Sequence, residues 1–102
     1  MDQRRQQLQT RLEMILGSGN VYFQPPSNIE LKFPCIVYKR STARTEFANN
    51  NPYAKRKRYT VTVMDRDPDS DIPDKLAEIQ MSYFDRYYVV DGLHHDVYAV
   101  YY

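Results

Sequence analysis

The stretch SYFDRYYVVDGLHHDVYAVYY, from Ser82 to Tyr102, decides the fold of this chain. Two runs of β-branched and aromatic residues lie on either side of Asp91-Gly92. Such a pair predicts a two-residue hairpin, because a type I′ turn needs positive φ at both central positions. The last strand carries Tyr98, Tyr101 and Tyr102, and an aromatic strand at a sheet edge pairs readily with other chains unless it is covered. We expect a neighbouring subunit to cover this edge, so the chain is predicted to assemble.

The length and composition describe one small domain without a strong overall charge. A chain of 102 residues buries roughly two-thirds of its unfolded surface, which is enough for one modest core. The 14 Lys and Arg residues nearly balance the 13 Asp and Glu residues, so the net charge does not favour nucleic acid or membrane. The chain has 10 Tyr and no Trp, and Tyr is common at protein interfaces.

The N-terminal and cysteine patterns indicate where the protein is made. A single cysteine excludes an internal disulfide and a four-thiolate metal site, and it weakly fits a reducing compartment. The first residues lead into no apolar segment typical of a signal peptide, and no apolar run approaches the roughly 20 residues of a membrane helix. We expect a soluble protein that is made in the cytoplasm and does not contact a membrane.

The periodicity of apolar residues predicts seven elements in the order α-β-β-β-α-β-β. The first helix spans Gln3 to Leu16, with Gln and Arg on one face and Gly17 ending it; its apolar stripe is Leu8, Leu12, Ile15 and Leu16. A second helix is expected from Asp69 or Ser70 to about Ile79, with Pro73 in its first turn and Ile72, Leu76 and Ile79 as its buried apolar stripe. The predicted strands before the final hairpin are Val21–Gln24, Pro34–Tyr38 and Tyr59–Met64. The pattern predicts an α+β fold, in which two helices flank a mixed, mostly antiparallel sheet in a single domain, residues 1–102.

Residues 41–57 are predicted to form a long projecting loop, since they lack periodicity and exceed the usual length of a connection. This loop ends in the basic run Lys55, Arg56, Lys57 and Arg58. Three interpretations stay open for the run. It could be a solvated loop end, it could hold nucleic-acid phosphates, or in a ring it could line a lumen or meet an acidic surface.

The aspartates at positions 65, 67, 69 and 71 alternate like the start of a calcium-binding loop. However, Ser70 stands where such a loop needs Gly, and Leu76 stands where it needs a bidentate Glu. The series is better interpreted as a strand end followed by a turn and a helix N-terminus, where carboxylates suit the helix dipole. We therefore predict no metal site here.

Other candidate chemistry is equally weak. His94 and His95 are adjacent, so on a strand they point to opposite faces and cannot chelate one ion together. Cys35 lies in an apolar strand without local features that would activate a thiol. The sequence has no Gly-rich phosphate loop and no Ser-centred nucleophile elbow. We predict that the protein is not an enzyme and has no cofactor.

Several phrases of the sequence together resemble small tail-completion or tail-terminator proteins of long-tailed, siphovirus-like bacteriophages. The resemblance covers about residues 8 to 102 and is one of overall pattern. The phrases are Val21-Tyr22-Phe23-Gln24-Pro25-Pro26, Leu31-Lys32-Phe33-Pro34-Cys35-Ile36-Val37-Tyr38, Tyr59-Thr60-Val61-Thr62-Val63, Asp67-Pro68-Asp69-Ser70, Phe84-Asp85-Arg86 and His95-Asp96-Val97-Tyr98.

This resemblance implies a structural virion protein that forms a homohexameric ring. The ring would cap the head-proximal end of the tail tube, stop its growth and join it to the head connector, with DNA passing through the lumen. The implied partners are the tail tube protein and a head-connector or neck protein. We predict that oligomer or partner contacts involve Tyr53, Lys55, Arg56, Lys57, Arg58, Tyr98, Tyr101 and Tyr102.

Two alternatives remain. The first is a head-completion or neck protein of the same virion, which would be similar in size. The second is a small nucleic-acid-binding module that uses residues 55–58 and the tyrosines for phosphate contact and base stacking.

Overall fold

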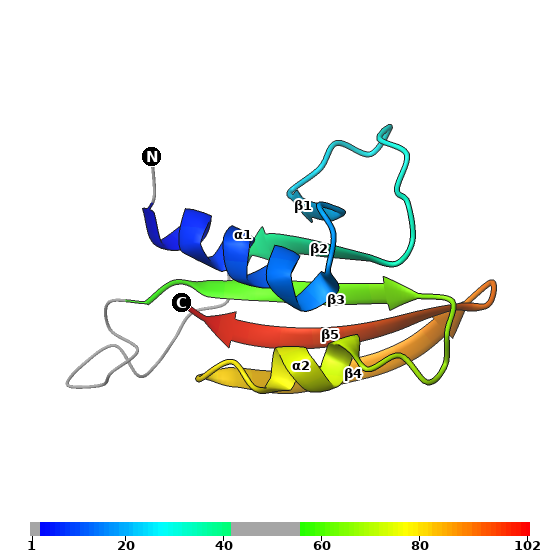
Figure 1. Cartoon of the computed structure of the whole chain (residues 1–102). Coiled ribbons are helices and arrows are strands. Elements are labelled where there is room, and N and C mark those ends of the chain that lie inside the picture. Colours follow the sequence, from blue (N-terminus) through cyan, green and yellow to red (C-terminus); the bar gives the residue numbers. More distant parts are fainter. Residues whose placement is uncertain (1–2, 42–55) are drawn as a thin grey trace.

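A computed structural model of the chain describes residues 3–41 and 56–102, and Figure 1 shows the arrangement of its elements. The predicted class, α+β, and the predicted order of elements are confirmed. The elements are α1 (Gln3–Leu16), β1 (Val21–Phe23), β2 (Cys35–Arg40), β3 (Arg58–Asp65), α2 (Ile72–Ala77), β4 (Ser82–Val90) and β5 (Leu93–Tyr101).

The five strands form one sheet in the order β1-β2-β3-β5-β4. Only β1 and β2 pair in parallel, whereas the other three pairs are antiparallel. Both helices lie on the same face of the sheet, and residues of α1 and α2 share one hydrophobic cluster with β1, β2, β3 and β5 (Figure 1). The opposite face of the sheet is not covered by any described helix.

The hairpin between β4 and β5 forms as predicted, because Asp91 and Gly92 have φ values of 52° and 75°. The expectation that the last strand is an uncovered edge is wrong. Strand β5 pairs with β3 on one side and with β4 on the other, so its backbone groups are used on both sides. The edge strand of the hairpin is β4.

The core forms where the apolar stripe of α1 meets alternate residues of the central strands. Leu8 and Leu12 of α1 are fully buried, as are Tyr38 of β2 and Val61 of β3. The helix ends where Gly17 takes a φ of 82° and its N–H donates to the carbonyl of Glu13 at 2.8 Å.

Polar side chains also fix α1 to the sheet, which the sequence pattern did not predict. The buried Tyr38 hydroxyl donates to Oε1 of Gln9 at 2.5 Å, and Nε2 of Gln9 donates to the Val21 carbonyl at 3.2 Å. The Arg5 guanidinium lies 4.5 Å from the centre of the Phe23 ring. Arg5 and Gln9 therefore contact the sheet, although Gln and Arg residues of α1 were expected on its other face.

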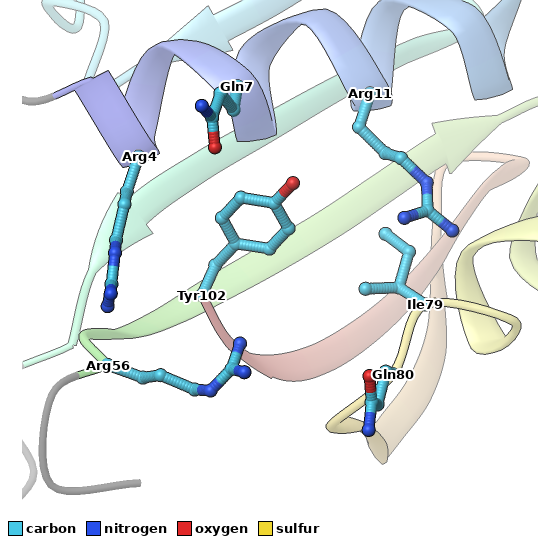
Figure 2. Close-up of a pocket in the computed structure, with 7 residues that line it drawn as sticks. All are labelled: Arg4, Gln7, Arg11, Arg56, Ile79, Gln80 and Tyr102. Carbon is cyan, nitrogen blue, oxygen red and sulfur yellow. The ribbon is translucent and has the colours of Figure 1, made fainter. Parts of the chain in front are cut away.

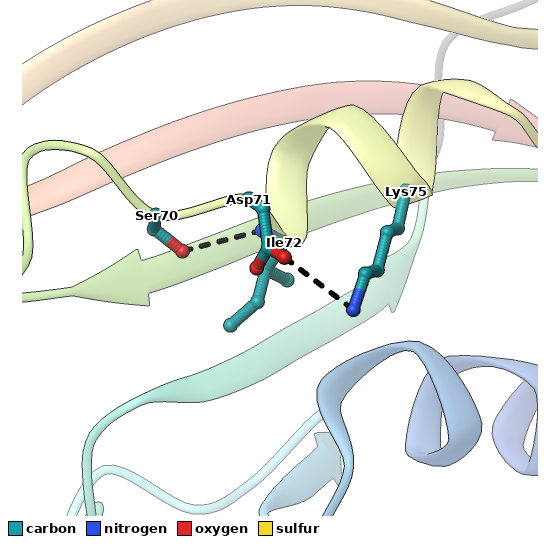
Figure 3. Close-up of polar contacts among 4 residues, drawn as sticks. All are labelled: Ser70, Asp71, Ile72 and Lys75. Carbon is teal, nitrogen blue, oxygen red and sulfur yellow. Dashed lines mark hydrogen bonds and ion pairs between the residues drawn. The ribbon is translucent and has the colours of Figure 1, made fainter.

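The second helix is shorter than predicted at both ends. It spans Ile72–Ala77 with Pro73 in its first turn, and its N-cap residue is Asp71, which makes no side-chain capping bond. The side-chain bond comes instead from Ser70, the residue before the N-cap, whose Oγ accepts the N–H of Ile72 at 3.3 Å (Figure 3). Lys75 forms an ion pair with Asp71 at 3.5 Å on the exposed side of this first turn (Figure 3).

The end of α2 is set by tightening of its last turn. The N–H groups of Glu78 and Ile79 bond to carbonyls three residues earlier, at 3.2 and 3.1 Å, instead of four. Ile79 is still buried, so its place in the predicted apolar stripe is correct although it lies beyond the helix. Met81, with a φ of 66°, then leads the chain into β4.

Candidate subunit interface

The predicted basic contact residues lie at or before the start of β3. Tyr53 and Lys55 lie outside the described residues. Arg56 is exposed, and Lys57 exchanges two backbone hydrogen bonds with Tyr102, at 3.2 and 3.0 Å. Arg58 is half-buried as the first residue of β3. The last two residues of the basic run therefore extend the sheet.

The predicted tyrosines in and just after β5 differ in their exposure. Tyr98 is only 7% exposed and belongs to the hydrophobic core, and burial raises the pKa of its phenol. Tyr101 is half-buried, with its ring edge against Tyr83 at 6.1 Å between ring centres. Tyr102 is half-buried and packs against the core. The surface of the hairpin is consequently formed by β4, not by these tyrosines.

Strand β4 is the most exposed apolar element among the described residues. Eight of its nine residues are exposed, and only Ser82 is half-buried. Because it lies at the end of the strand order, its outer backbone edge pairs with no other strand of the described chain. Its large exposed apolar side chains are Tyr83, Phe84, Tyr87, Tyr88, Val89 and Val90.

These apolar side chains lie on both faces of the sheet. Phe84 is in register with the core residue Tyr98 and so lies on the helix side, whereas Tyr83 is in register with Ala99 and lies on the uncovered face. Phe84 remains 59% exposed although it lies on the helix side. A partner that docks on β4 could therefore contact apolar side chains on both faces as well as the backbone edge.

A β-bulge interrupts β4 at its centre. The register shifts between Phe84 and Arg86, which leaves Asp85 without a partner residue on β5. The side chains of Asp85 and Arg86 lie 3.6 Å apart as an exposed ion pair. Bulges and charges on an edge strand oppose indiscriminate pairing. The strand thus consists of two apolar segments on either side of a charged bulge, which favours a specific partner.

Two histidines of β5 hold the aromatic side chains of β4 in place. The Tyr87 hydroxyl lies 2.6 Å from Nδ1 of His94, and the two rings stack. The rings of Tyr88 and His95 stack with centres 4.5 Å apart. The predicted opposite orientation of the two histidines is confirmed, since their partners on β4 are consecutive residues.

The other edge of the sheet is less accessible. Strand β1 has three residues, and Gln9 of α1 already donates to its Val21 carbonyl. After Gln24 come Pro25 and Pro26, which cannot donate backbone hydrogen bonds. Of the two edges, β4 offers the longer and more apolar surface.

The acidic series after β3 forms a turn. The N–H of Asp67 donates to Oδ1 of Asp65 at 3.0 Å, and the N–H of Asp69 donates to Oδ1 of Asp67 at 2.9 Å. These carboxylates bind backbone groups, as expected at a strand end and turn. Within residues 3–41 and 56–102, no group of three or more His, Cys, Asp or Glu side chains is placed to hold a metal ion.

Sequence reasoning missed β4 as the exposed element. Its sequence, SYFDRYYVV, has apolar residues on both faces, and such a strand is either buried on both sides or an exposed edge.

No described helix is long and apolar enough to cross a membrane. Comparison of the chain with protein-family models, with curated proteins and with solved structures found no match.

Proposed function

We propose that the protein is a structural virion protein, a tail terminator that forms a ring on the head-proximal end of a phage tail tube. The observation that carries this proposal is β4, a nine-residue edge strand with six large exposed apolar side chains. An edge of this length and composition is an aggregation site unless a specific partner covers it. A neighbouring copy of the chain would cover it in a closed ring.

The two edges of the sheet differ, which suits head-to-tail contacts. Strand β4 is long and apolar, whereas β1 is short and partly covered by Gln9. Contacts between unlike surfaces generate rings when the rotation closes. In such a ring β4 of each subunit contacts the next subunit, and no β4 edge is left exposed.

The charges along β3 support a ring with two different rims. One end of the sheet, the basic end, carries Lys39, Arg40, Arg56, Lys57 and Arg58. The other end, the acidic end, carries Asp65, Asp67, Asp69 and Asp71, together with the cations Arg66 and Lys75, of which Lys75 is paired with Asp71. If neighbouring subunits meet side by side through their sheet edges, the basic ends gather on one rim and the acidic ends on the other. A terminator needs two such unlike rims, one for the tail tube and one for the connector.

The test of assembly is the molar mass of the protein by size-exclusion chromatography with light scattering, combined with negative-stain images in the presence of tail tubes. We expect a ring for the native chain and a monomer for Val89→Lys/Val90→Lys. These valines are about half exposed, so lysine is tolerated in the fold, but it opposes strand pairing at an edge.

The matched control is Met14→Lys, which removes an exposed apolar side chain from α1, where Met14 is 77% exposed. This variant should form the same ring as the native chain. A native chain that is monomeric at all concentrations and forms no ring on tail tubes would overturn the proposal.

Cross-linking of intact particles separates the terminator from a neck protein. Cross-links from the ring to the tail tube protein support the terminator. Cross-links to connector proteins alone would assign the chain to the neck instead.

A further inference from the structure

A pocket at the basic end combines three arginines from distant parts of the chain. Arg4, Gln7 and Arg11 come from α1, Arg56 precedes β3, Ile79 and Gln80 follow α2, and Tyr102 follows β5 (Figure 2). The pocket has a volume of about 360 Å³. Four segments that are far apart in the sequence therefore form one concave site.

The lining of this pocket, which we call the three-arginine pocket, suits an anion. No Asp or Glu is among the described residues that line it. Arg4 and Arg11 are seven residues apart, so α1 presents both on one side, with Gln7 between them. Tyr102 points its hydroxyl toward α1, while Arg56 approaches from the other side (Figure 2). Guanidinium groups with neighbouring neutral donors bind carboxylates and phosphates through paired hydrogen bonds.

The position of the pocket indicates what kind of anion it meets. It lies beside the start of β3, at the basic end of the sheet, because Arg56 and Tyr102 both line it and Tyr102 pairs with Lys57. In the proposed ring this end forms one rim. The exposed Lys57, next to Arg56, adds positive charge that would attract an acidic surface toward that rim.

We propose that the three-arginine pocket binds Asp or Glu side chains of an acidic segment on the partner that stacks on the basic rim. This inference rests on the proposed function, since the ring defines the rim. A protein segment is favoured over DNA for two reasons. The pocket is a single hollow that accepts one or two side chains, whereas DNA binding uses a series of phosphate contacts. Tyr102, the one aromatic residue among the described residues that line the pocket, is half-buried and so offers little surface for base stacking.

The experiment is a calorimetric titration of the full chain with a hexaglutamate peptide, at low and at near-physiological salt. The variant is Arg11→Gln/Arg56→Gln, and the matched control is Lys39→Gln/Arg40→Gln, which removes the same charge from the same end but outside the pocket. All four residues are exposed, and thermal melts verify that each variant is folded.

We expect the pocket variant to bind the peptide at least about tenfold more weakly than the native chain. The control should change the affinity by no more than about twofold. An equal loss of peptide affinity in the two variants, or no loss of affinity in the pocket variant, would overturn the proposal. A pocket-dependent preference for a short DNA duplex over the peptide would also overturn it and assign the site to phosphates.

The two proposals fail in distinguishable ways. The pocket lies within one chain, so the titration measures it whether or not a ring forms. A monomeric native chain that still binds hexaglutamate through the pocket would refute the ring alone. A native ring without pocket-dependent binding would refute the pocket alone.

Discussion

Cys35 shows how burial decides the chemistry of a single residue. Its side chain is fully buried on β2, and burial raises the pKa of the thiol from its ordinary value of 9.0 to about 11. A protonated, inaccessible thiol is a poor nucleophile and a poor metal ligand. Cys35 therefore acts as a small apolar side chain, in agreement with its apolar sequence context.

The raised pKa of Cys35 predicts a loss of stability at alkaline pH. Above pH 9 the unfolded thiol ionises while the folded thiol keeps its proton up to about pH 11. The folded state then binds more protons, so the free energy of unfolding falls as the pH rises through this window. Burial also raises the phenol pKa values of Tyr38 and Tyr98, which adds to the decline.

Urea unfolding at a series of pH values, with Cys35→Ala as the comparison, measures the contribution of the thiol. In the variant the free energy of unfolding should still fall with rising pH because of the tyrosines. The fall should be less steep than in the native chain. Parallel curves for the two proteins would show that the thiol titrates at its ordinary pKa in the folded state.

At the scale of elements, α1 illustrates how few contacts dock a helix. Of its 14 residues only Leu8 and Leu12 are buried, while Ile15 and Leu16 pack at the margin of the core. The polar contacts of Gln9 and Arg5 with β1 and β2 fix the position of the helix on the sheet. The apolar stripe supplies the burial, and these polar side chains supply the orientation.

Leu12→Ala should lower the free energy of unfolding by about 2–5 kcal/mol, because it removes a fully buried side chain and leaves a cavity. This is a large part of the roughly 5–15 kcal/mol that a domain has in total. Met14→Ala on the same helix should change it by less than about 0.5 kcal/mol, since Met14 is exposed. Chemical denaturation measures both. An unchanged transition for Leu12→Ala would mean that α1 does not dock through this residue.

At the scale of the whole molecule, the near-neutral net charge conceals a separation of charge along the sheet. Arg58 and Asp65 are the first and last residues of β3, so roughly 23 Å of strand separates them. The basic run precedes this strand and the acidic turn follows it. The net charge of the whole sequence therefore gives no indication of the two charged ends. They become apparent only when the basic and acidic residues are assigned to the two ends of β3.

Replacement of residues 44–55 by a short Gly-Ser turn tests the predicted role of the segment between β2 and β3. The monomer should stay folded, because the Ser41 N–H already donates to the Arg58 carbonyl at 2.9 Å, so the ends of the replaced segment leave from adjacent strands. Ring formation or tail attachment should be lost. Circular dichroism and light scattering measure the two effects, and a shortened protein that still completes infectious particles would contradict the prediction.

The sequence by itself determined the local elements. The spacing of Leu8 and Leu12 predicts α1, Gly17 ends it, and Asp91-Gly92 makes the hairpin turn, because each depends on neighbours within a few residues. The extent of α2 was predicted less well, since Ser70 and Asp71 can each begin a helix, and competition among neighbouring polar groups decides between them.

The tertiary structure alone decided which strand is the exposed edge and which arginines share a pocket. Either strand of the hairpin could have paired with β3, and its sequence is apolar in both halves, so local pattern does not distinguish β5 from β4. Strand β5 became central and buried Tyr98, which left the apolar side chains of β4 exposed. The three-arginine pocket likewise exists only because packing brings together segments that are far apart in the chain.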